Sequence, residues 1–317
     1  MKTKLKLSVA CGIAALLVGF NVQAQEKTFN IGGDVELDLT AKDADETSYG
    51  HGGRVKLNAV GELKGEDYFV KGVAQPLVPF KGSDLGYDDV YLQMGRSNWD
   101  VQIGRFEGVD LFPVGKDTVA EHAGGLSPYG TNAARGRKDS VIHTAFHLKP
   151  NDAMNFELGV MGAKNNGDFE KFAAVRPAMT YKAGAVTVRA GMESVKSTPA
   201  GGSESSHTGF GIGAGFDVAG GTVNASLSKK NADDDGVDTT SMALNFTQGP
   251  WGVGYVTSKD DMGGADPKLN TFYGAYSVPL FGSKDASVTF AASTSKADNV
   301  SANEKVNAAR VRFNYTF

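Results

Sequence analysis

The sequence predicts an all-β protein, a transmembrane antiparallel β-barrel of sixteen strands, with fourteen or eighteen as alternatives. Three observations predict it: apolar and polar residues alternate along many short segments, tight turns alternate with longer loops, and the chain ends on an aromatic strand. Apolar runs in the body fall short of the ~20 residues that a membrane helix needs. A net charge of −4 over 317 residues gives no reason to expect nucleic-acid binding.

Residues 1–24 have the features of a secretory signal peptide. A basic segment precedes an apolar core at 7–20, and Val22 and Ala24 occupy the positions of an A-x-A-like cleavage site. We expect cleavage after Ala24, which leaves residues 25–317 as one barrel domain. The single cysteine, Cys11, lies in the leader, so burial or a closed hydrogen-bond network must hold the mature chain together.

The strands follow in order along the mature chain. In the first strand, apolar residues alternate with polar ones, which is the period of two that a strand shows when one face is apolar. The apolar residues are Phe29, Ile31, Val35, Leu37 and Leu39. A soluble sandwich would show the same pattern in any one strand, so the argument rests on repetition. The alternation recurs at 54–63, 89–94, 99–103, 154–160, 186–193, 210–218, 223–228, 241–247 and 309–317. In a membrane barrel the polar face lines the lumen and the apolar face meets lipid.

The connections alternate in length. Short turns rich in Gly, Pro, Asn and Asp fall at 64–67, 97–98, 149–152, 182–184, 219–221, 248–250 and 282–285. Longer polar connections fall near 41–51, 76–86, 106–139, 163–171, 195–207, 229–238, 259–268 and 296–305. Seven turns and eight loops join sixteen strands, and this asymmetry is typical of outer-membrane barrels with both termini on the periplasmic side.

Two segments resemble known families. The last strand, ARVRFNYTF, ends on Phe317 and resembles the assembly signal of Gram-negative outer-membrane proteins, which implies the barrel-assembly machinery as a partner. The run GRFEGVDLFPVGKDTVAEHAGG at 104–125 resembles sugar porins of the raffinose glycoporin type, and the whole mature chain resembles Gram-negative porins. The PEFGG-like motif of general porins is absent from the loop at 106–139.

The resemblance implies a fold and a function. In sixteen-stranded porins the loop after the fifth strand folds inward, so 106–139 is expected to be a constriction loop. Such porins are usually homotrimers, and small lipid-facing residues (Gly33, Ala59 and Ala309) fit a subunit contact. We expect passive diffusion of small hydrophilic solutes, carbohydrates above all, across the outer membrane. A general non-specific porin is the alternative, and a barrel hydrolase using Ser127 or Ser140 or a surface adhesin is a weaker one.

Charges in the loop offer a mechanism for selectivity. The acids Glu107, Asp110, Asp117 and Glu121 come first, and the bases Arg135, Arg137 and Lys138 come last. Strand parity also points bases from the wall into the lumen, at Arg54, Lys56, Lys71, Arg189, Arg310 and Arg312. If acids and bases face each other across a narrow lumen, the transverse field orients polar solutes. The alternative is that these charges only solvate a wide, water-filled lumen.

Sugar selectivity needs aromatic faces along the path, because a ring stacks on the apolar face of a pyranose. The candidates from the wall and the loop are Phe69, Tyr91, Phe106, Phe112, Tyr129, Phe172 and Tyr273. No spacing of His, Asp or Glu predicts a metal site, and no cofactor is expected.

Overall fold

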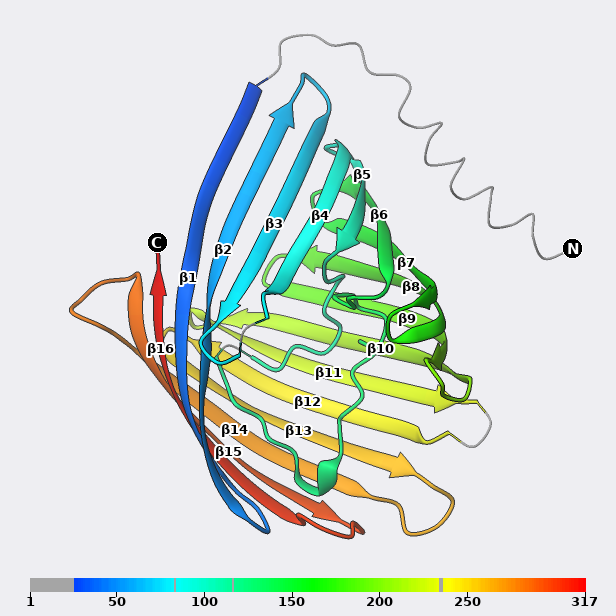
Figure 1. The fold of residues 1–317 in the computed structure, drawn as a ribbon, viewed down its shortest axis with the longest axis vertical. Coiled ribbons are helices and arrows are strands. Elements are labelled where there is room, and N and C mark those ends of the chain that lie inside the picture. Colours follow the sequence, from blue (N-terminus) through cyan, green and yellow to red (C-terminus); the bar gives the residue numbers. More distant parts are fainter. Residues whose placement is uncertain (1–25, 83, 116, 234–235) are drawn as a thin grey trace, which may run out of the picture.

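The computed structural model describes residues 26–82, 84–115, 117–233 and 236–317, so the leader predicted at 1–24 lies outside the described residues. Sixteen strands form a closed antiparallel barrel in which each strand pairs with its neighbours in the chain and β1 closes on β16 (Figure 1). The predicted strand count is therefore confirmed. The strands are β1 (Glu26–Asp43), β2 (Thr47–Lys64), β3 (Phe69–Pro79), β4 (Gly86–Arg96), β5 (Trp99–Arg105), β6 (Ile142–Asn151), β7 (Met154–Asn166), β8 (Phe169–Ala183), β9 (Val186–Pro199), β10 (Ser205–Val218), β11 (Gly221–Ala232), β12 (Asp238–Gln248), β13 (Trp251–Asp261), β14 (Lys268–Pro279), β15 (Ala286–Asp298) and β16 (Lys305–Thr316).

The two faces of the barrel wall have opposite polarity to those of a soluble protein. Phe29 and Ile31 point outward and are 68% and 67% exposed, whereas Asp100, Ser228 and Thr271 on the lumen side are fully buried. A lipid-facing outer surface and a polar interior explain this reversal. Because side chains alternate with a period of two, a slip of one residue would exchange the faces, so the pattern fixes the register.

The connections at the loop end are shorter than the sequence predicts. Strand pairing continues to Asp43 opposite Thr47 and to Asn166 opposite Phe169, so the loops predicted at 41–51 and 163–171 shrink to 44–46 and 167–168. The reason is that strands running beyond the membrane have polar residues on both faces, which removes the apolar alternation while the backbone ladder continues. The described residues contain one short 3-10 turn, η1 (Ala123–Gly125), and none of their helices is long and apolar enough to cross a membrane.

The chain terminus closes the seam between β1 and β16. The backbone N–H of Gly33 donates to the carbonyl of Phe317 at 2.9 Å, and the N–H of Phe317 donates back at 3.0 Å. The Phe317 ring lies over Gly33, where a Cβ would meet its Cζ at 2.7 Å. Gly33 is therefore covered by the chain's own terminus, which corrects its assignment as a small residue left open for a subunit contact.

Candidate functional site

The segment between β5 and β6 folds into the barrel, as predicted. It runs from residue 106 to 141 and crosses the interior to the wall opposite β5 (Figure 1). Asn245 Nδ2 on β12 donates to the carbonyl of Pro113 at 2.5 Å. Farther along, the N–H of Glu121 donates to Ser293 Oγ on β15 at 3.3 Å, and that of Ala123 to Ser295 Oγ at 2.9 Å. We call residues 106–141 the inner loop.

A row of glycines on the lumen face of β10 lets the inner loop lie close to the barrel wall. Gly209, Gly211 and Gly213 occupy successive lumen-facing positions of β10. A Cβ at Gly209 would come within 1.9 Å of Tyr129 Oη, and one at Gly211 within 2.8 Å of Thr131 Oγ1. Side chains at these positions would therefore push the loop toward the centre of the lumen.

Buried ions hold both the start of the inner loop, at Val109, and its returning half, at residues 129–134. Arg176 on β8, 1% exposed, donates from Nη2 to the carbonyl of Val109 at 2.7 Å and from Nε to that of Thr131 at 3.2 Å. Its counter-ions are Glu157 at 3.4 Å and Glu193 at 3.7 Å.

The two carboxylates also bind the loop directly. Glu157 accepts from the N–H of Val109 at 3.0 Å. Glu193 accepts from the phenol of Tyr129 and from the N–H of Ala134 at 3.0 Å. Each buried charge is thus paired and hydrogen-bonded, which is the condition for keeping a charge out of water.

Sequence reasoning missed this anchoring triad of Arg176, Glu157 and Glu193. The available signal was a set of charged residues at mid-strand positions with lumen parity on β7, β8 and β9. Parity places them inside the barrel but does not reveal that backbone groups of a distant loop are their partners.

Four of the aromatic candidates anchor the loop. Phe106 stacks on His143 with centroids 4.0 Å apart and is 1% exposed. Phe112 and Tyr273 pack together with Ala243 and Val256, and Phe172 packs in a second cluster with Ala134 and Val141. Phe112, Phe172 and Tyr273 are 6%, 4% and 5% exposed. This corrects the stacking assignment of Phe106, Phe112, Phe172 and Tyr273, because none has a face open to a solute.

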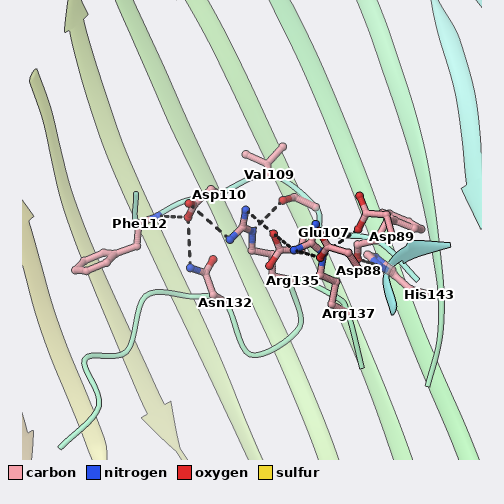
Figure 2. Close-up of polar contacts among 12 residues, drawn as sticks. Asp88, Asp89, Glu107, Val109, Asp110, Phe112, Asn132, Arg135, Arg137 and His143 are labelled. Carbon is pink, nitrogen blue, oxygen red and sulfur yellow. Dashed lines mark hydrogen bonds and ion pairs between the residues drawn. The ribbon is translucent and has the colours of Figure 1, made fainter. Parts of the chain in front are cut away.

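Two of the loop acids, Glu107 and Asp110, pair with bases of the loop itself. Arg135 lies 3.2 Å from Glu107 and 3.6 Å from Asp110, and Arg137 lies 3.5 Å from Glu107 (Figure 2). Arg137 also reaches Asp88 at 2.7 Å and Asp89 at 2.8 Å on β4. Arg137 thereby ties the end of the loop to the wall. Burial alone would lower the pKa of Arg137, but the carboxylates of Asp89, Glu107 and Asp88 raise it above its usual value.

The wall bases likewise have wall partners. Arg312 binds Asp38 with two bonds of 2.7 Å and lies 3.2 Å from Glu36. Arg54 pairs with Asp34 and, at 3.3 Å, with Glu36. Lys56 lies 3.4 Å from both Asp34 and Asp88. Acids of β1 that the charge argument left out therefore neutralise these bases, so Arg54, Lys56 and Arg312 face wall acids rather than the acids of the loop.

The remaining predicted charges are spread around the lumen. Arg310 donates to the backbone carbonyl of Asp117 at 2.8 Å, and Glu121 pairs with Lys42 on β1 at 3.0 Å. Lys138 places its ammonium 5.6 Å from the centroid of the Phe172 ring. Within the described ranges, Arg189 on β9 and Lys71 on β3 have no ion pair.

Three aromatic candidates remain near open space. Tyr91 on β4 faces the lumen and meets Phe106 edge-on at 5.9 Å. Phe69 lies on the same face of β3, toward the tight-turn end, where it lines a cavity of about 430 Å³ with Glu62, Lys71 and Gln93. Tyr129 is held by Glu193, and burial together with that carboxylate raises the pKa of its phenol, so it stays neutral at physiological pH.

The comparisons with known proteins agree with this architecture. The family described as porin-like glycoporin RafY matches the chain over residues 20–317. The chain belongs to the porin-like glycoporin RafY family. It is therefore a porin, a channel of the Gram-negative outer membrane, and family and fold both point to a channel rather than an enzyme. No curated protein sequence matches this porin.

Solved structures show similar barrels at low identity. The porin is similar to OmpT of Vibrio cholerae in its trimer form, with 12% identity, a TM-score of 0.71, and 92% of this chain and 99% of that chain covered. It is similar to the anion-selective porin from Comamonas acidovorans, with 15% identity, a TM-score of 0.70, and 92% and 100% covered. A mutant of the Rh. blastica porin gives 14% identity, a TM-score of 0.60, and 92% and 100% covered. At these identities the similarity establishes the fold alone.

Proposed function

We propose that this porin passes small carbohydrates by passive diffusion, through a water-filled channel that the inner loop narrows. The observation that carries the proposal is the pairing of charge along the passage. Arg54, Lys56 and Arg312 of the wall and Arg135 and Arg137 of the loop each lie within 4.0 Å of at least one carboxylate. Paired charges leave a dense array of hydrogen-bond donors and acceptors with little net charge, and this favours neutral polyols over ions.

A sugar path along β3 and β4 follows from the rings that stay accessible. Tyr91 lies beside the inner loop, and Phe69 lies on the same lumen face near the tight-turn mouth. Lys71 and Gln93 lie between them as cross-strand partners on that face. We infer that a sugar stacks on Tyr91 and then on Phe69, while Lys71, Gln93 and Glu62 bond its hydroxyls.

The test is single-channel conductance of the refolded mature chain in a planar bilayer, titrated with raffinose and with maltodextrins. A saturable block by sugar is expected, and Tyr91→Ala and Phe69→Ala should each weaken it several-fold. Leu244→Ala, on the outward face of β12, is the matched control because it leaves the lumen unchanged. Stable conductance that no sugar alters would leave a general non-specific porin, the alternative to this proposal.

Assembly and export complete the proposal. We infer a homotrimer whose contacts use the outer face of the first strands, where Leu57 lies two residues from Ala59, Tyr49 lies at the loop end of β2, and both are exposed. Phe317 is the residue that the barrel-assembly machinery would read, and the leader would be removed after Ala24. Cross-linking in native membranes tests the trimer, and N-terminal sequencing of the mature chain tests the cleavage site.

A further inference from the structure

The outer surface of the barrel carries lysines near the loop ends of its later strands. Each lies at or close to the loop end of its strand, and each is exposed. They form three directly opposed cross-strand pairs, Lys164 with Lys171, Lys259 with Lys268, and Lys296 with Lys305. Lys196 on β9 and Lys229 on β11 stand between these pairs. We call this set the lysine arc; it spans β7 to β16.

Strand register places the arc on the lipid-facing side. Lys229 is directly opposite Phe210, an outward residue that is 43% exposed. The same row continues through Thr240 and Lys259 to Lys268. Since directly opposed residues share a face of the sheet, these lysines point away from the lumen.

The three opposed pairs are unfavourable in the barrel alone. Like charges directly opposite each other on a sheet destabilise the pairing. Nearby acids relieve part of this at one member of each pair: Lys171 lies 3.6 Å from Glu204, Lys259 lies 2.7 Å from Asp266, and Lys296 lies 2.8 Å from Asp298. Glu204 is shared with Lys196, which lies 2.6 Å away. Among the described residues, Lys164, Lys268 and Lys305 form no ion pair. An anionic partner between the members of each pair would remove the repulsion.

The residues next to the arc indicate the chemistry of that partner. One outward position closer to the apolar belt, Lys196, Lys259, Lys268 and Lys296 are followed by the hydroxyl and amide side chains of Ser194, Thr257, Asn270 and Thr294. Lys164, Lys171 and Lys229 are instead followed by Gly162, Ala173 and Leu227. Apolar side chains such as Phe272 and Phe290 follow, 59% and 52% exposed. On β9 and on β13 to β15, the order of side chains from the rim toward the apolar belt is therefore cation, then hydroxyl or amide, then hydrocarbon. A lipid with phosphate groups, a sugar-like headgroup and acyl chains has the complementary order.

The arc does not continue around the whole rim. On β1 to β4 and at the described positions of 80–85, the exposed large apolar residues near the rim are Tyr49, Phe80, Leu85 and Tyr87, and Lys81 is exposed beside them without an opposed lysine partner on a strand. A uniform solubilising belt of lysines would cover both sectors. The restriction to β7–β16 indicates a sector that faces lipid, while the apolar sector is the one assigned above to neighbouring subunits.

We propose that the lysine arc binds the phosphate groups of a phosphorylated glycolipid in the outer leaflet, with its acyl chains lying on the apolar belt below. Lysine stems lie along the apolar surface and place their ammonium groups at headgroup level, where anionic lipid attracts them. This inference concerns the outer surface and does not depend on which solute the channel passes.

The experiment uses the full mature barrel in detergent, titrated with bisphosphorylated lipid A and followed by native mass spectrometry. A variant combining Lys259→Gln, Lys268→Gln, Lys296→Gln and Lys305→Gln should lose affinity about tenfold or more, and added salt should weaken wild-type binding. Lys64→Gln with Lys284→Gln at the opposite rim is the control and should bind as wild type does. Heat-modifiable mobility on gels verifies that every variant is a folded barrel.

Four readouts decide the outcome: binding of the dephosphorylated lipid, the unfolding temperature, displacement by inorganic phosphate, and the affinity of the arc variant. Lipid A stripped of phosphate should bind far more weakly, and lipid-free arc variants should unfold at the same temperature as wild type or higher, because the opposed charges are gone. If lipid A without phosphate bound as tightly as bisphosphorylated lipid A, binding would depend on apolar contact alone, and the proposal would be overturned. Displacement of the lipid by low concentrations of inorganic phosphate, or unchanged affinity in the arc variant, would overturn it as well.

Discussion

Arg137 joins the inner loop to the wall by bridging Asp88, Asp89 and Glu107. Replacing it by glutamine leaves these carboxylates without their shared cation, so the passage becomes more negative. We expect Arg137→Gln to shift selectivity toward cations, measured as a change in reversal potential under a potassium chloride gradient. Arg137→Lys keeps the charge and should shift it much less. An unchanged reversal potential in Arg137→Gln would show that ions do not pass near this residue.

His122 makes loop docking sensitive to pH. Its ring contacts Thr271 Oγ1 at 2.8 Å, and burial lowers its pKa below 6.5, against a smaller opposing effect of Glu121. An undocked His122 binds a proton at its ordinary pKa, whereas the docked one resists it. Docking is therefore complete above about pH 6.5 and weakens as the pH falls below it.

The check is the rate at which a protease cuts within 106–141, measured between about pH 7 and 5. The rate of cleavage should increase as the pH falls in wild type, and it should increase less in His122→Asn. His51→Asn, on the exposed part of β2, is the control and should behave as wild type does. A pH dependence that survives in His122→Asn would assign the effect to other groups.

At the scale of elements, the glycines of β10 determine how deep the inner loop lies. Valine at Gly209 would collide with Tyr129, which is pinned by Glu193 and cannot easily turn away. We expect Gly209→Val to displace the loop into the lumen and lower single-channel conductance while the barrel stays folded. Gly52→Ala is the control, since a Cβ at that lumen-facing position of β2 meets nothing within 4 Å. Equal conductance in both variants would mean that the loop does not set the narrowest point.

The elements also show what the sequence can and cannot predict. Turn residues such as Lys149–Asp152 and Ala219–Gly221 mark hairpins locally, so counting them gave the correct number of strands. Loop lengths were overestimated near 41–51 and 163–171, because pairing beyond the membrane needs no apolar face. The inward fold of the loop followed from resemblance, and its docking partners did not, because hydrogen bonds from Arg176 to Val109 and Thr131 join residues far apart in sequence.

At the scale of the whole molecule, closure of the barrel brings together the acids and bases that neutralise each other along the lumen. Inside, β1 supplies Asp34, Glu36 and Asp38 opposite bases of β2 and β16, an arrangement that only closure of the barrel creates. Strand parity identified the bases, but which acids face them depends on the register of β1 against its two neighbours. Closure of the sheet is therefore a condition for the lining on which the proposed selectivity rests.

The same closure makes the last residue important for stability. Phe317 exchanges two backbone hydrogen bonds with Gly33, and its ring covers that glycine. Deleting Phe317 removes the ring and both bonds, each worth about 0.5–1.5 kcal/mol, whereas Phe317→Ala removes the ring alone. We expect the temperature at which the refolded barrel loses its heat-modifiable mobility to fall in the order wild type, Phe317→Ala, deletion. If both variants unfold at the same temperature as wild type, the seam between β1 and β16 does not limit stability. Any defect in living cells would then come from recognition of the terminal residue during assembly.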